Sequence, residues 1–417
     1  MQVLHTTGKI GMKNSKLLAY ILVAFCVLVS YKDGFPEDTS FGNPISINHT
    51  DKRVSNAAAL IDDDGRIYIG WTREEGDKNN IYIVTSSDDG KTFSDKARVN
   101  GDADMPSGIN HAPSMSIGAK GELYIAWITE SSGNGSASNI KFSRSVDGGK
   151  TFEPSITVND DKLPASHGFE SMAIAPDGTI YITWLDGRDK KEGGASATYF
   201  ARSVDSGKTF EKNVRIDGSS CPCCQTAVTV APDGAVYVSW RKVFKGDVRE
   251  IVVSKSSDRG ISFSESFIVG NDNWVIAGCP HRGPSLSVDK DGILYVVWYT
   301  EGGDGLPSIY IADSKDGGKK FSKTPLPYAE GAFPDHPVMA LNKDGKPVLS
   351  WEETTPVVGR LMLQLPDEKP QQMGQGVRGR RARDPVISAN KKGDILLVWS
   401  QDEMRFAKTL LRLFKGD

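Results

Sequence analysis

Seven tryptophans recur along this chain at nearly constant spacing, and this regularity constrains the fold more than any single motif. Their successive separations are 56, 57, 56, 58, 53 and 48 residues. The positions are Trp71, Trp127, Trp184, Trp240, Trp298, Trp351 and Trp399. A period of this size is typical of repeat architectures, in which each unit buries its apolar face against its neighbours.

Each repeat has the same pattern before its tryptophan. A glycine stands six residues upstream in a polar turn, and the turn separates two short runs rich in β-branched and aromatic residues. The glycines are Gly65, Gly121, Gly178, Gly234, Gly292, Gly345 and Gly393. Two such runs around a glycine turn predict a β-hairpin, and a third and a fourth strand are expected to follow in each repeat.

Five repeats also contain an octapeptide close to S-x-D-x-G-x-T-F. The copies span residues 86–93, 145–152, 203–210, 256–263 and 314–321. In such a turn the aspartate accepts backbone N–H groups, the glycine takes a positive φ, and the phenylalanine anchors the turn in the core. The octapeptides resemble the Asp boxes, or BNR repeats, of the sialidase-like β-propeller superfamily, and the resemblance covers roughly residues 41–417. It implies a structural role for the boxes on the outer rim.

We therefore predict an all-β fold over residues 41–417, a seven-bladed β-propeller of four-stranded antiparallel blades. Sialidases of the superfamily have six blades, so six is the alternative count. The short run at residues 44–48 resembles the strand that follows an Asp box. We expect it to supply the outer strand of the last blade and to close the ring, which leaves no exposed sheet edge.

The N-terminal segment, residues 1–31, predicts export. Lys13 and Lys16 precede an apolar run at residues 17–30, which fits the core of a signal peptide better than a membrane span. No clean cleavage site follows, so the segment is either a signal peptide or an N-terminal membrane anchor. The mature chain is expected to be periplasmic or extracellular and to meet a membrane only through this segment. A net charge of −3 gives no overall attraction to nucleic acid.

Most cysteines and histidines share one register within the repeats. Cys221 precedes its tryptophan by the same interval as Cys279 does in the next repeat, and Cys223 likewise matches His281. Other members of the same segment are Cys224, His111, His167 and His336. The segment leads into the innermost strand of each blade. We expect these entries together to surround the mouth of the central channel, where propellers usually bind ligands.

Thiolates and imidazoles that converge in this way suit Zn or Cu. We predict a metal centre with Cys221, Cys223, Cys279 and His281 as ligands. Cys224, His111, His167 and His336 would be further ligands or would support them. Two alternatives stay open, because cysteines of exported proteins also form disulfides. Cys279 could bond to Cys221 or Cys223 and link two blades, or the cysteines could be inert and buried.

The resemblance to sialidases implies a second hypothesis, a glycoside hydrolase acting on acidic glycans. Sialidases open their first blade with an Arg-Ile-Pro motif whose arginine binds the substrate carboxylate. The first repeat here lacks that arginine, but Arg282-Gly283-Pro284 and Arg383-Asp384-Pro385 are similar to the motif. Arg282 and Arg383 would then bind an anionic ligand.

Glu170 would be the acid/base carboxylate of such a hydrolase, with Asp335 and Asp384 as second choices. The partner expected on either hypothesis is a small molecule or a glycan. A third hypothesis is a non-catalytic adhesion or scaffold propeller. Resemblance in fold alone does not decide among these activities.

Overall fold

The computed structural model describes residues 44–47, 57–107, 112–130, 137–190, 196–376, 381–402 and 407–416. All of them lie in one compact unit, Glu37–Asp417. In these ranges the regular structure consists of β-strands, with no helix long and apolar enough to cross a membrane. The predicted signal or anchor segment, residues 1–31, lies outside the described residues.

The strands pair in sequence order into antiparallel sheets. The first two sheets are β2 (Ala58–Ile61), β3 (Ile67–Glu75), β4 (Lys78–Ser86) and β5 (Ala97–Arg98), then β6 (Ser114–Ile117), β7 (Leu123–Glu130), β8 (Ser138–Ser145) and β9 (Ile156–Thr157). The next group is β10 (His167–Ile174), β11 (Ile180–Asp186), β12 (Ser196–Ser203) and β13 (Val214–Ser220). It is followed by β14 (Ala227–Val230), β15 (Val236–Phe244), β16 (Val248–Ser256), β17 (Phe267–Ile268) and β18 (Trp274–Val275). A single residue pair, Ser220 with Lys242, joins these last two groups into one nine-stranded sheet.

Three further sheets complete the unit. They are β19 (Ser285–Val288), β20 (Leu294–Thr300), β21 (Ser308–Ser314) and β22 (Ser322–Pro325), then β23 (Phe333–Leu341), β24 (Pro347–Thr354), β25 (Gly359–Gln364) and β26 (Gln371–Gln375), and last β27 (Ala382–Ala389), β28 (Ile395–Asp402) and β29 (Ala407–Phe414) with β1 (Ile45–Ile47). β1 pairs with β29, Ile45 opposite Leu411, so the N-terminal strand completes the C-terminal sheet as predicted.

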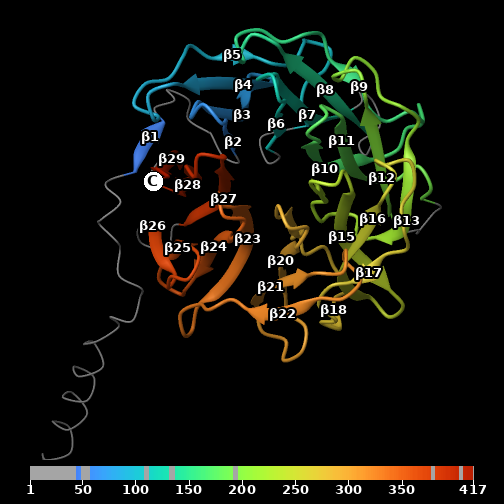
Figure 1. Cartoon of the computed structure of the whole chain (residues 1–417), viewed down its shortest axis with the longest axis vertical. Helices are drawn as coiled ribbons and strands as arrows, with labels where there is room; N and C mark the ends of the chain where they lie inside the picture. Colours follow the sequence, from blue (N-terminus) through green and yellow to red (C-terminus); the bar gives the residue numbers. More distant parts are fainter. Residues whose placement is uncertain are drawn as a thin grey trace, which may run out of the picture. The chain divides into compact units, whose positions relative to one another are not determined.

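The strand groups form a closed ring (Figure 1). The first strands of successive groups are neighbours all the way round, from β2 through β6, β10, β14, β19, β23 and β27 back to β2. The predicted all-β propeller is thereby confirmed. Each of the seven tryptophans lies in the second strand of its group, and none is more than 2% exposed. Burial of one large aromatic side chain in each repeat explains the spacing in the sequence.

The glycine six residues before each tryptophan has a backbone reason. All seven have φ between 81° and 94°. This backbone conformation is unfavourable for any residue that has a Cβ atom. These glycines therefore close the hairpin between the first and second strands of every group.

The Asp boxes are turns held by their own side chains. In the first box, Asp88 accepts hydrogen bonds from the backbone N–H of Thr92 at 2.9 Å and from its hydroxyl at 2.6 Å. These bonds lower the pKa of Asp88 to about 2. The box phenylalanines pack against buried clusters, as Phe210 does edge-on against Phe142 at 5.2 Å. The hydrogen bonds of Asp88 stay within the turn, which agrees with a structural role.

Candidate metal centre and axial cavity

Three cysteines meet in the loop between β13 and β14. The Sγ atom of Cys221 lies 3.7 Å from that of Cys223 and 3.3 Å from that of Cys224, and all three sulfurs lie within 4.8 Å of one another. The three residues are at most 5% exposed, and none forms a disulfide. A disulfide bond is about 2.05 Å long, whereas thiolates around a tetrahedral Zn²⁺ at about 2.3 Å lie roughly 3.8 Å apart. The observed separations are close to the second arrangement.

Two buried arginines lie beside these sulfurs. Arg249 donates from Nη1 to the Sγ atom of Cys221 at 3.0 Å. Arg241 donates to the backbone oxygens of Tyr299 at 2.7 Å and Arg282 at 3.2 Å. Among the residues that the structure describes, neither guanidinium pairs with a carboxylate, and Arg241 Nη1 and Arg249 Nε have no hydrogen-bond partner. Two buried positive charges favour negative charge on the cysteines.

The proton distribution in the cluster follows from these contacts. Hydrogen bonds from the thiols of Cys223 and Cys224 lower the pKa of Cys221, and the Arg249 charge acts in the same direction. The same contacts raise the pKa of Cys223 and that of Cys224, the latter to about 11. A metal-free cluster therefore holds its first thiolate on Cys221.

Cys279 and His281 come from the loop between β18 and β19. Cys279 is exposed, and its thiol contributes to the raised pKa of Cys223. His281 is exposed, with a φ of 56°. The compact group of sulfurs consists of Cys221, Cys223 and Cys224, with Cys279 at its margin.

The remaining predicted histidines do not join the cysteines. His167 is buried in a separate group with Asp161 and Asp186. The His336 side chain is 45% exposed, and its Nδ1 lies 3.4 Å from carboxylate oxygens of Asp335 and Glu352. His111 lies outside the described residues.

Both arginines proposed for an anionic substrate already meet carboxylates. Arg282 makes a two-point ion pair with Asp335, and its Cζ lies 4.7 Å from the centre of the Tyr299 ring. Arg383 pairs with Asp384, and its Nη2 lies 3.3 Å from Asp402. A substrate carboxylate would have to compete with these internal pairs. The structure therefore offers no unpaired guanidinium at Arg282 or Arg383.

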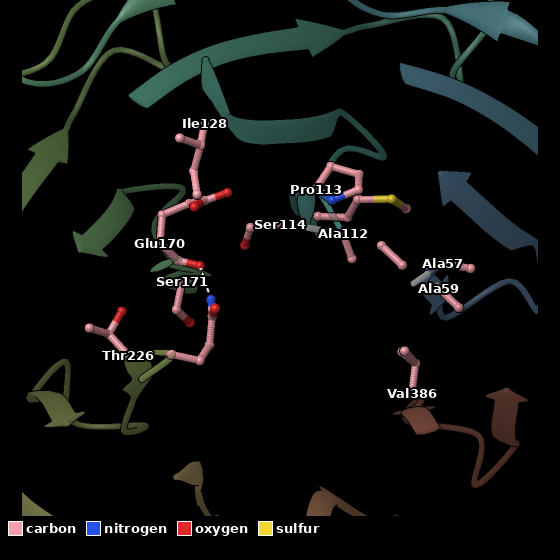
Figure 2. A pocket seen from close by; sticks show the side chains of 13 residues that line it. Ala57, Ala59, Ala112, Pro113, Ser114, Ile128, Glu170, Ser171, Thr226 and Val386 are labelled. Atoms are coloured by element: carbon pink, nitrogen blue, oxygen red, sulfur yellow. Dashed lines mark hydrogen bonds between the residues drawn. The ribbon is translucent and has the colours of Figure 1, made fainter. Parts of the chain in front are cut away.

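An axial cavity of about 340 Å³ lies between the inner strands. Glu170, Ser171 and Thr226 line one side of it, and Ala57, Ala59 and Val386 line another (Figure 2). Its other lining residues are Ala58, Ala112, Pro113, Ser114, Met115, Ile128 and Gln225. Apolar side chains form much of the cavity wall, and its hydroxyl, amide and carboxyl groups lie on β6, on β10 and in the loop before β14.

Glu170 is the titratable group of this wall. Its side chain is buried, and burial raises the pKa of Glu170 to about 8. At neutral pH the carboxyl group is therefore largely protonated, and it can donate as well as accept a hydrogen bond.

The cavity wall and the cysteine loop are continuous. Gln225, directly after Cys224, donates a side-chain hydrogen bond to the backbone oxygen of Glu170. The Thr226 hydroxyl donates to the backbone oxygen of Phe169 at 2.7 Å, and the Phe169 side chain packs on the cysteines. The cysteine loop is therefore followed directly by a residue of the cavity wall, Gln225.

A family profile described as "BNR repeat-containing family member" matches residues 48–329, about two thirds of the chain. The chain belongs to the BNR repeat-containing family. No curated protein matches this sequence.

Several solved structures are similar to this BNR-family chain. A Dyadobacter fermentans protein of unknown function is 14% identical, with a TM-score of 0.52 over 92% of this chain and 100% of that one. The polysaccharide lyase Uly1 is 10% identical, with a TM-score of 0.54 over 95% of each chain. A Penicillium chrysogenum alpha-L-arabinanase complexed with arabinobiose is 13% identical, with a TM-score of 0.49 over 73% of this chain and 92% of that one. At these identities the likeness concerns the fold alone.

Some residues of the site are not evident from the register of cysteines and histidines in the repeats. They are Asp161, Asp186, Arg241 and Arg249. A usable signal was the charge beside the buried tryptophans: Arg241 and Glu352 directly follow one, and Asp186 stands two residues after one. Glu352 is buried, and burial raises its pKa to about 7. Charged residues at positions that must be buried indicate a polar site.

Proposed function

We propose that this BNR-family propeller is an exported protein that binds a thiophilic transition-metal ion, Cu(I) or Zn²⁺. The ligands are the thiolates of Cys221, Cys223 and Cys224, and Cys279 supplies a fourth sulfur where the ion requires one. The observation that carries the proposal is the group of three buried, unbonded sulfurs beside two buried arginines.

The charge of such a centre balances. Three thiolates and Cu(I) carry a net charge of −2, and the guanidinium groups of Arg241 and Arg249 offset it. Zn²⁺ with four thiolates carries the same net charge. Without anionic sulfur, the two arginines would be buried positive charges with no counter-ion, an arrangement that costs several kcal/mol per charge. Soft thiolates select Cu(I) and Zn²⁺ over hard cations.

Metal loading tests the proposal directly. Protein purified without a His tag would be reduced, loaded with Cu(I) or Zn²⁺ against a competing chelator, and analysed for bound metal. We expect one tightly bound ion in the wild type and none in the C221S/C223S/C224S variant. The C279S variant is the matched control, because its thiol is exposed, and we expect it to retain Cu(I). Mass spectrometry that finds a quantitative disulfide in protein isolated without reductant, together with no metal uptake, would contradict the proposal and favour a scaffold propeller.

A second candidate function belongs to the axial cavity. We propose that the cavity binds a small molecule or a glycan, with protonated Glu170 as the hydrogen-bond donor and, in a glycoside hydrolase, as the general acid. The support is the position of Glu170 in the wall and its raised pKa. Because Arg282 and Arg383 pair internally, neutral glycans suit the site better than the acidic ones expected from sialidases.

Fluorogenic glycosides decide this second candidate. Turnover of an arabinoside or another neutral glycoside, lost in E170Q, would support a hydrolase. Turnover of a sialoside would instead favour the acidic-substrate alternative. A folded protein that turns over none of these and binds no oligosaccharide from a glycan array would exclude both.

A further inference from the structure

A second cluster of metal-ligand side chains lies between β8, β10 and β11. Its members are Asp161, in the loop after β9, His167, the first residue of β10, and Asp186, the last residue of β11. The Nε2 atom of His167 lies 3.2 Å from Asp161 Oδ2 and 3.4 Å from Asp186 Oδ2. None of the three side chains is more than 4% exposed.

The tautomer of His167 directs a lone pair at the carboxylates. Its Nδ1 lies 2.6 Å from the backbone oxygen of Ser138, which can only accept, so Nδ1 carries a proton. Nε2 of the neutral ring is then free to act as a ligand. Nε2 and Asp161 Oδ2 are both buried, and neither has a hydrogen-bond partner in the described structure. Two unsatisfied polar atoms that face each other indicate that something is bound between them.

The distances fit a metal ion better than a hydrogen bond. Metal–nitrogen and metal–oxygen bonds of about 2.0–2.2 Å place neighbouring ligand atoms roughly 3.0–3.5 Å apart. Hydrogen bonds hold both carboxylates in place: Asn159 donates to Asp161 Oδ1 at 3.0 Å, and Trp184 donates to Asp186 Oδ2 at 2.7 Å. Such outer contacts orient ligands in metal sites.

The charged groups around Asp161, His167 and Asp186 have an excess of two negative charges. Arg188 lies beside the cluster, 2.9 Å from Asp186 Oδ2 and 2.6 Å from Asp160 Oδ1. Its Nε is 3.8 Å from Asp161 Oδ2. The carboxylates of Asp160, Asp161 and Asp186 with one guanidinium and a neutral imidazole carry a net charge of −2, which a divalent cation neutralises and a proton on His167 only halves.

We propose that Asp161, His167 and Asp186 bind a divalent cation that prefers oxygen and imidazole ligands, of the class represented by Mn²⁺. The site is separate from the cysteine cluster and takes a different class of metal. Mn²⁺ is the suitable probe because carboxylates bind it well and thiolates bind it poorly.

The experiment is a titration of the wild-type protein with Mn²⁺, in which the loss of the free-ion EPR signal measures binding. We expect one equivalent to bind. D161N and H167Q are expected to weaken binding at least about tenfold, whereas D189N should change it by less than about twofold. Asp189 is the matched control, since it lies in the same region but pairs with Tyr199 and Arg215.

Two results would overturn the proposal. One is a folded wild type that binds no Mn²⁺, together with ¹⁵N NMR showing protons on both ring nitrogens of His167, which would identify an imidazolium paired with two carboxylates. The other is a D161N variant that binds Mn²⁺ as tightly as the wild type. Binding of Mn²⁺ to the C221S/C223S/C224S variant would separate this site from the cysteine centre.

Discussion

Two neighbouring strand groups place different chemistry at the same register. His167 precedes Trp184 by the same interval as Cys223 precedes Trp240, and both stand at or just before the start of adjacent inner strands. The first belongs to a cluster of carboxylates and an imidazole, and the second to a cluster of thiols. Register therefore decides where a side chain lies in a propeller, and residue type decides which ion can bind there.

The charged residues around the two clusters also differ. Two residues after the tryptophan, the first group has Asp186 and the second has Lys242, which pairs with Asp217 at 2.5 Å. Excess negative charge surrounds His167, and two arginines without a carboxylate partner in the described structure flank the cysteines. The carboxylates of the first cluster exceed its one guanidinium, and the two guanidinium groups beside the second cluster have no carboxylate partner in the described structure. This difference is the basis for proposing a hard metal ion at the first cluster and a soft one at the second.

The largest expected effect tests whether the two clusters are independent. We expect C221S/C223S/C224S to lower Cu(I) affinity by more than roughly a hundredfold, because loss of the ligands themselves weakens binding more than loss of the residues that orient them. Mn²⁺ uptake should be unchanged. Competition with a Cu(I) chelator and EPR of Mn²⁺ measure the two affinities. Parallel loss of both metals in a folded variant would refute the separation.

A second test uses Glu170, which shares strand β10 with His167 and whose backbone oxygen accepts a hydrogen bond from Gln225, next to Cys224. Its pKa of about 8 exceeds the value of 4.5 in the unfolded chain, so the folded carboxyl keeps its proton where the unfolded one has lost it. Stability should fall as pH rises from about 4.5 to about 8 and then level off, by at most about 5 kcal/mol. E170Q should abolish this slope and be the more stable protein at pH 8. Urea unfolding at pH 5 and pH 8 measures it, and an unchanged slope would exclude a neutral Glu170.

A third, smaller effect concerns the arginines beside the sulfurs. R249M removes the charge next to Cys221, so the thiolate midpoint of the metal-free cluster should rise by about one pH unit. Ultraviolet absorbance of the thiolate during a pH titration measures that midpoint. R215M, which removes an exposed arginine paired with Asp189, is the control. Equal behaviour of the two variants would mean that Arg249 does not stabilise the thiolate.

The smallest effect is expected at the rim. D88N removes an exposed Asp-box carboxylate whose hydrogen bonds stay within its own turn. Both metal affinities should stay within about twofold, and Tm should fall by only a few degrees. Differential scanning calorimetry and the two metal titrations test this. A loss of either metal would give the Asp boxes a role at the axis.

Much of the fold was predictable because it depends on local patterns. The tryptophan period, the hairpin glycines and the Asp boxes led to a closed ring, and the run at residues 44–48 was correctly expected to pair with the last group. For the site, the sequence predicted Glu170 and the cysteines of the Cys221–Cys224 loop as candidate functional residues. It did not separate His167 from the cysteines, because equal register in adjacent groups does not mean contact.

The sequence by itself determined the ring, since every repeat must bury its tryptophan and turn at its glycine. Only the tertiary structure decided which polar side chains touch. Arg249 reaches Cys221 across 28 residues, and Arg282 meets Asp335 across 53. Contacts of this kind depend on loop paths and on the neutralisation of buried charge, which no repeat pattern encodes.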